Sequence, residues 1–179
     1  MNVVVDIMEE IVGRVSDTLT PQLQKVDSMV NGVHFDYGYA QEIIQAIQNR
    51  SLSRSKRFSN YPLVGLIQPF RESESQVIGF DKEVNLDLFI VTGSKADIRT
   101  KERYKSKLKP VLYPIYKELV RQVGMDARIV GGGYSGTVRY VKEDHPYYPT
   151  ANQNTLNDFL DAIIIRELRF NLYEISCLK

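Results

Sequence analysis

The sequence predicts an α+β fold, in which a small, mostly antiparallel (mixed) sheet is packed by helices and carries long loops. Residues 2–19 and 99–123 repeat apolar side chains at steps of three and four, the spacing of a buried helix face. Residues 81–91 alternate apolar and polar side chains, the period of a strand. Further strands follow the second long helix without alternating helices, which favours α+β over α/β.

The N-terminal part is predicted to be helical. The helix over residues 2–19 should end or restart at Thr20-Pro21. A short extended piece over 33–39 precedes a short helix over 40–48. We expect residues 1–50 to form a helical part and residues 61–179 a sheet-and-helix core, together one domain, because 179 residues is the length of a single domain.

The core begins with two strands, over 61–70 and 81–91, which are joined by a polar connection. Alternate residues of the second strand, from Val84 to Ile90, are predicted to face the core, with carboxylates on the other side. Phe89 and Val91 make its far end apolar on both faces. We therefore expect another element to cover that end.

The C-terminal half begins with the helix over 99–123, whose apolar stripe starts at Tyr104. Pro110 and Pro114 should bend or split it, because each removes a backbone donor. Short strands over 127–130 and 137–141 are predicted, followed by a loop over 142–156 and a helical turn over 159–162. The last strand is expected over 163–175, with a bulge between Leu172 and Tyr173.

The composition excludes several classes of protein. One cysteine and two histidines exclude a disulfide framework and leave almost no basis for a Cys/His zinc site. A net charge of +1 provides no global field that would steer nucleic acid to the chain. The apolar runs are shorter than the ~18 residues of a membrane span, and the early acidic residues are unlike a signal peptide. We expect no cofactor and no membrane partner.

A glycine-rich run over 131–136 matches the G-x-G-x-x-G pattern of dinucleotide-binding loops. That reading requires a helix to follow, because the helix N-terminus holds the pyrophosphate. Residues 137–141 have a strand pattern instead. The run is therefore predicted to be a glycine-rich turn between strands.

Candidate catalytic groups are few. Asp81, Glu83 and Asp87 share the polar face of one strand, and clustered carboxylates can bind Mg²⁺. The lysine motif of a nuclease is missing, so we predict a solvated strand face without metal. His145 follows Asp144 and could orient toward a serine, but a histidine in this setting is more typical of a surface. We predict that the chain is not an enzyme.

Positive charge is concentrated in two segments. Residues 50–57 and 95–109 hold eleven basic and two acidic residues, although the whole chain is nearly neutral. Such patches contact phosphate or an acidic protein surface; the alternative is a solvated face. Our candidates for DNA- or partner-facing side chains are Arg54, Lys56, Arg57, Arg99, Lys101 and Lys105.

Five sequence patches lie between residues 33 and 165: Val-His-Phe-Asp-Tyr-Gly (33–38), Phe-Ser-Asn-Tyr-Pro-Leu-Val-Gly-Leu (58–66), Asn-Leu-Asp-Leu-Phe-Ile (85–90), Lys-Pro-Val-Leu-Tyr-Pro-Ile-Tyr (109–116) and Leu-Asn-Asp-Phe-Leu-Asp-Ala-Ile (156–163). Together they resemble small virion proteins of tailed phages that infect Bacteroidota, including the crAss-like group. The element order is similar to that of tail terminators and head–tail ring proteins.

The resemblance implies a structural virion protein that forms a homo-oligomeric ring in the neck or tail of a phage, as a head–tail connector or tail terminator. Its partners would be further copies of itself, neighbouring neck, portal or tail proteins, and genomic DNA in the lumen. We expect the long loops to contact neighbouring subunits, with Tyr134, His145, Tyr147 and Tyr148 as candidates. The alternatives are a metal-dependent nucleic-acid-processing enzyme and a free nucleic-acid-binding protein.

Overall fold

A computed structural model describes residues 3–51, 61–74, 82–94, 98–130, 138–145 and 159–172. It confirms the α+β class. The sheet has six strands: β1 (His34–Gly38), β2 (Leu63–Glu74), β3 (Lys82–Ser94), β4 (Ile129–Val130), β5 (Arg139–His145) and β6 (Phe159–Leu172). The order is β1-β2-β3-β6-β4, and β5 also pairs with β6. Only β1–β2 is parallel among these pairs of described strands, so the sheet is mixed and mostly antiparallel.

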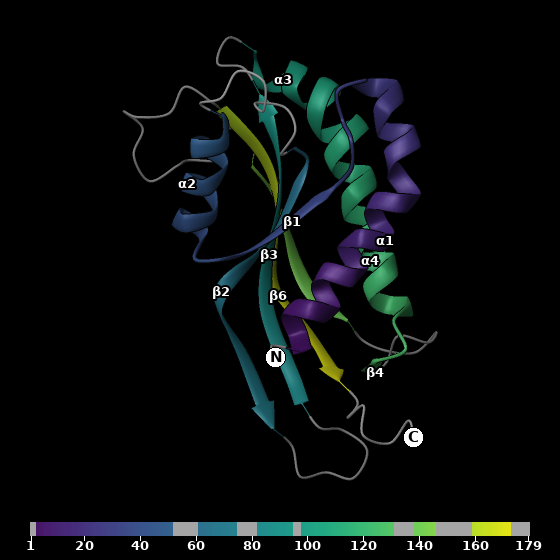
Figure 1. Ribbon diagram of the computed structural model, residues 1–179, viewed down its shortest axis with the longest axis vertical. Coiled ribbons are helices and arrows are strands. Elements are labelled where there is room, and N and C mark those ends of the chain that lie inside the picture. Colours follow the sequence, from purple (N-terminus) through teal and green to yellow (C-terminus); the bar gives the residue numbers. More distant parts are fainter. Residues whose placement is uncertain are drawn as a thin grey trace.

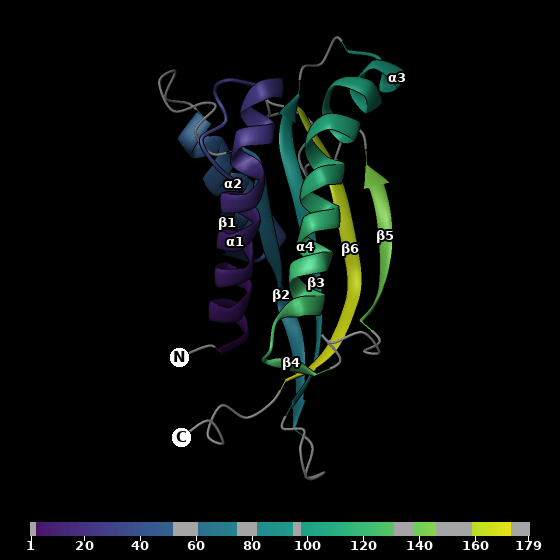
Figure 2. The ribbon, with the colours of Figure 1, turned by 90° about the vertical axis from the view of Figure 1, so that its right-hand side faces the viewer.

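Helices cover the two faces of the sheet unequally (Figure 1). One face carries α1 (Val3–Val26) beside a second, composite helix made of α3 (Thr100–Arg103), η1 (Tyr104–Leu112) and α4 (Tyr113–Met125). The opposite face carries the shorter α2 (Ala40–Ser51) over one end of the strands. Figure 2 shows α1 on one side of α4, and β6 and then β5 on the other.

Helix α1 continues through Pro21, so the prediction that it ends or restarts at Thr20-Pro21 was wrong. Leu19 and Leu23 are both buried, and the same apolar face therefore extends past the proline. The Thr20 hydroxyl donates to the Ser16 carbonyl at 2.6 Å within that turn. Burial on both sides of Pro21 outweighs the loss of one backbone hydrogen bond.

The predicted disturbance at Pro110 and Pro114 takes the form of a π-helical segment rather than a break. Residues 104–112 are wound as a π-helix between two α-helical pieces. The Tyr113 N–H bonds to the Leu108 carbonyl, five residues back. The wider winding accommodates Pro110, which has no N–H, and Pro114 is the second residue of α4.

The two faces of the sheet bury separate apolar clusters. The prediction that the far end of β3 is covered on both faces is confirmed, because Phe89 and Val91 pack with Ile43 and Ile47 of α2. Gly65 lies opposite Phe89 in the register of β2 and β3. A Cβ atom on Gly65 would approach the Phe89 ring to 2.5 Å, so glycine makes room for the aromatic ring.

Several strand boundaries differ from the predictions. β3 continues through Ser94 and β5 through His145, so the predicted loop over 142–156 begins too early, and residues 146–158 lie outside the described part. β6 is already a strand at Phe159, where a helical turn was predicted. A register shift of β6 falls near Glu167, which has φ 51°. The predicted bulge between Leu172 and Tyr173 reaches outside the described residues.

Candidate binding surface

A row of lysines runs along the composite helix. Lys101, Lys105, Lys109 and Lys117 are all exposed, and Arg99 precedes the row as a further exposed cation. The lysines are separated by multiples of four residues, which places them along one side of the helix. Tyr113 occupies the remaining position of this series and is half-buried. We call these four lysines the lysine row.

The lysine row has no anionic partner among the described residues of its own subunit. Several other cations of the subunit do have anionic partners: Arg14 and Arg128 both pair with Asp126, and Arg121 pairs with Glu118. The only acidic side chain of segment 99–117 is Glu102. The row is therefore a strip of uncompensated positive charge, and it contains the predicted residues Lys101 and Lys105.

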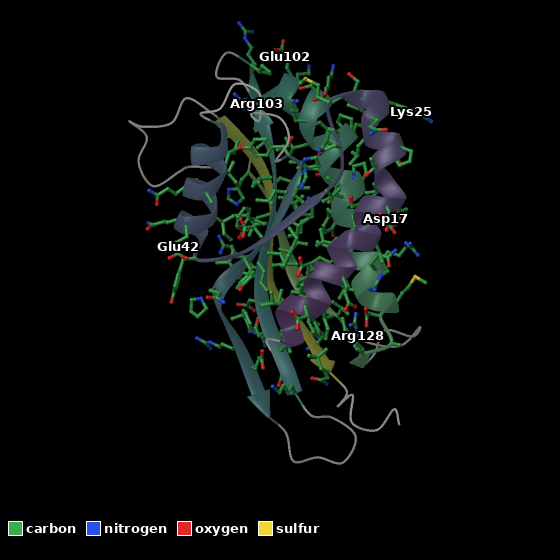
Figure 3. All side chains as sticks on the ribbon, viewed as in Figure 1. Asp17, Lys25, Glu42, Glu102, Arg103 and Arg128 are labelled. Atoms are coloured by element: carbon green, nitrogen blue, oxygen red, sulfur yellow. The ribbon has the colours of Figure 1, made fainter. Side chains whose placement is uncertain are left out.

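Arg103 lies between Lys101 and Lys105 in the sequence but is fully buried. It donates from Nε to the Ile98 carbonyl at 2.8 Å and from its guanidinium to Asp161 Oδ1 at 3.0 Å. Both side chains are 0% exposed. The pair fastens the start of the composite helix to β6, at the end where Figure 3 labels Arg103. The buried ion pair therefore holds in place the end of the helix at which the row begins.

The apolar stripe of this helix was predicted to start at Tyr104. The buried residue at this point is its neighbour Arg103, and Tyr104 is 47% exposed. The Tyr104 ring meets Tyr113 edge-on, with centroids 6.0 Å apart. An arginine in a polar, basic segment gives no sequence signal of burial, which is why Arg103 was counted with the surface cations. Its acidic partner lies 58 residues further along the chain.

Strand β5 is joined to the composite helix by a polar cluster. The Tyr113 hydroxyl donates to Asp144 Oδ2 at 2.6 Å, and Lys142 also bonds to Asp144. The Lys142 Nζ lies 4.4 Å from the Tyr113 ring centroid, within cation–π distance. The side of the helix that carries Tyr113 therefore faces β5, away from α1.

The pKa shifts in this cluster favour the ordinary protonation states of its side chains at neutral pH. The hydrogen bond to Asp144, followed by burial, raises the pKa of Tyr113. Burial, followed by the hydrogen bond with Tyr140, raises the pKa of Tyr116. Burial alone would lower the pKa of Lys142, but its bonds to Asp144 and Tyr113 outweigh this and raise it. Neither tyrosine is activated as a base, because both remain protonated at neutral pH.

The sheet face beside α2 holds the remaining predicted residues. Asp87 Oδ1 accepts a hydrogen bond from the Glu167 N–H at 2.8 Å and so stabilises the bulge of β6. Glu83 lies on the same face of β3, four residues before Asp87. Asp81 is outside the described residues. Within the described part of the chain, no three His, Cys, Asp or Glu side chains are grouped to hold a metal ion.

His145 and Asp144 are neighbours in sequence, but their side chains have different partners. Asp144 faces the helices and bonds Tyr113, whereas the His145 Nε2 lies 3.1 Å from Glu143 Oε2. Adjacent residues of a strand point to opposite faces, so these two cannot form a catalytic Asp–His pair. The structure places His145 at the end of β5, and its predicted role at a subunit interface stays a prediction.

Some predicted residues fall outside the described ranges. They are Arg54, Lys56, Arg57, Tyr134, Tyr147 and Tyr148. Lys109 and Lys117 were not predicted as contact residues, although their spacing from Lys101 and Lys105 is a signal that the sequence contains. Arg99 lies just before α3 and is exposed, as expected of a contact residue.

The chain matches no protein-family model and no curated protein sequence. Among the described residues, no helix is long and apolar enough to cross a membrane. The functional interpretation therefore rests on the geometry of the lysine row and the elements that hold it.

Proposed function

We propose that this chain is a structural virion subunit that forms a homo-oligomeric ring in the neck or tail of a tailed phage, as a head–tail connector or tail terminator, and performs no catalysis. The observation that carries the proposal is the lysine row. Charge that a subunit leaves uncompensated on a firmly anchored helix is suited to an anionic surface outside that subunit.

The surrounding structure supports an architectural role. Two polar groups that the sequence analysis weighed for chemistry have structural roles: Asp87 stabilises a bulge, and Asp144 joins β5 to the helix. The resemblance of the sequence patches to phage virion proteins points in the same direction. An α+β fold by itself hosts many functions, so the site carries the proposal.

A free nucleic-acid-binding protein is the second candidate, and the same row favours it. Lysines that contact phosphates give affinity without base readout, and this affinity falls steeply with salt. Such a protein would bind DNA as an isolated subunit. A ring subunit would associate with itself in the absence of DNA.

Sedimentation velocity distinguishes these functions. The purified chain should sediment as a discrete oligomer whose size is unchanged by added duplex DNA, Mg²⁺ or a chelator. A species that remains a monomer up to high concentration would contradict the ring proposal. A monomer that sediments with DNA at low salt would establish the second candidate, and DNA cleavage that requires Mg²⁺ would establish an enzyme.

A further inference from the structure

The row of lysines has a counterpart of opposite sign on the same chain. Asp6, Glu9, Glu10 and Asp17 lie on α1, and residues 3–24 contain a single basic residue, Arg14. Glu9, Glu10 and Asp17 are exposed, and Asp6 is half-buried. The four acids lie opposite the buried apolar stripe of α1, so they share its outward face. We call them the acid face.

The subunit uses little of this negative charge internally. Glu10 pairs with Arg128 at 2.7 Å, while Asp6, Glu9 and Asp17 have no ion-pair partner among the described residues. The helix dipole explains an acid in the first turn of α1, but Asp17 lies in the middle of the helix, where that effect has faded. Figure 3 labels Asp17 on α1.

The two charged surfaces cannot neutralise each other within one subunit. α1 packs against α4 through its apolar face. The side of the composite helix that carries Tyr113 faces β5, which lies on the far side of α4 from α1 in Figure 2. The acid face and the lysine row therefore lie on different flanks of the same helical layer. A second subunit, placed beside the first, would bring them together.

We propose that the lysine row of one subunit docks on the acid face of α1 in a second copy of this chain. This inference rests on the proposed ring function and names the interface. Both surfaces are stripes along a helix: the acid face runs from Asp6 to Asp17 on α1, and the lysine row runs from Lys101 to Lys117 on the composite helix. The row carries four positive charges and the acid face four negative ones, of which Glu10 already pairs with Arg128, so docking brings surfaces of opposite charge together.

A contact between two different surfaces joins subunits head to tail. Such heterologous contacts close into a ring when the rotation between neighbours divides the circle evenly, and otherwise form a filament. Each subunit then contributes one row and one acid face, and in a closed ring every row is docked on the acid face of a neighbour. The pairing also predicts assembly that weakens with salt, because exposed ion pairs are screened over about 8 Å at 0.15 M ionic strength.

A charge-exchange experiment tests this docking. One variant carries K101E, K105E and K109E, and the other carries D6K, E9K and D17K. Each alone has two surfaces of like sign and should fail to assemble, with a dissociation constant raised about 10-fold or more. Mixed in equal amounts, the two variants should assemble again, because each then supplies the charge that the other lacks.

For the lysine variant, the matched control is K25E with R71E and R139E, which makes the same change in net charge at exposed sites outside both the row and the acid face. It should assemble like the wild type, and circular dichroism should show all variants folded. If both exchange variants assemble normally while the wild type forms rings, the interface is wrong and the ring function stands. If the wild type never assembles, both proposals fail.

Two other results would overturn the docking. If the lysine variant fails to assemble, the mixture does not recover, and only the wild type binds duplex DNA, then the row binds nucleic acid. If the lysine variant alone fails and the acid-face variant assembles normally without DNA binding, the partner of the row is an acidic surface of a different protein or of another part of this chain.

Discussion

Removing Asp161 isolates the contribution of the buried ion pair that anchors the composite helix. Arg103 and Asp161 are both 0% exposed, and their side chains meet at 3.0 Å. In Asp161→Ala the guanidinium keeps its bond to the Ile98 carbonyl but loses the Asp161 carboxylate in a site without solvent access. Breaking a buried pair in this way typically costs about 3–5 kcal/mol.

This loss is large beside the ~5–15 kcal/mol stability of an ordinary domain. For a chain of this length it corresponds to a decrease in Tm of about 6–20 °C. Urea unfolding, followed by circular dichroism, measures the change as a lower midpoint with an unaltered slope. The attached end of the helix should also exchange its amide hydrogens faster than α4 does.

Two controls separate the buried charge from side-chain volume and from ordinary surface pairs. The double variant R103M with D161L removes both charges and should recover most of the lost stability, because apolar replacement of a buried pair is often neutral or stabilising. Glu72→Ala breaks the partly exposed pair with Lys82 and should cost at most about 1 kcal/mol. A loss below about 1 kcal/mol in Asp161→Ala would refute the anchoring role.

Three further predictions concern other parts of the fold. Hydrogen bonds from Arg128, then from Arg14, outweigh burial and hold the pKa of Asp126 well below its usual value of about 4. The stability that the ionised Asp126 contributes is therefore present above pH 4 and is lost as the pH falls further. Asp126→Asn should cost roughly 2–3 kcal/mol at pH 7 and flatten the acid-unfolding curve below pH 4, and an unchanged curve would contradict this. Gly65→Ala should destabilise the protein by about 1–3 kcal/mol, because the new Cβ atom meets the Phe89 ring. Gly13 is exposed on its helix, and a Cβ atom there meets nothing within 4 Å, so Gly13→Ala should stabilise the protein by about 0.5–1 kcal/mol. Equal Tm values for the two variants would disprove the packing at Gly65. Tyr116→Phe removes the 2.9 Å bond with Tyr140 and should cost about 1 kcal/mol in chemical unfolding, while a gain in stability would show that the bond contributes nothing.

Periodicity predicted the parts of the fold in which one face of an element is buried. The strand over 81–91, the helix over 40–48 and the long helix ending near Val123 were found where apolar residues recur at the period of their element. The covered end of β3 followed from two adjacent apolar positions, Phe89 and Val91. These features are local in sequence, so the sequence is sufficient to find them.

Features that depend on distant residues were missed. Helix α1 passes Pro21 because Leu19 and Leu23, on either side of it, are buried in the core, and this burial depends on tertiary packing. Phe159 begins a strand because β3 pairs with it along Gly93 and Ser94. The burial of Arg103 depends on Asp161 in β6. The candidate surface was predicted in part, because Lys101 and Lys105 are exposed as expected, but no local pattern distinguished them from Arg103.

Electron microscopy of the purified chain tests the ring proposal most directly. At low salt and without DNA, averaged images should show closed, rotationally symmetric particles with a central opening, and these should dissociate as the salt concentration rises. The triple variant K101E, K105E and K109E should show no such particles under the same conditions. Isolated subunits at every salt and protein concentration for the wild type would contradict the account.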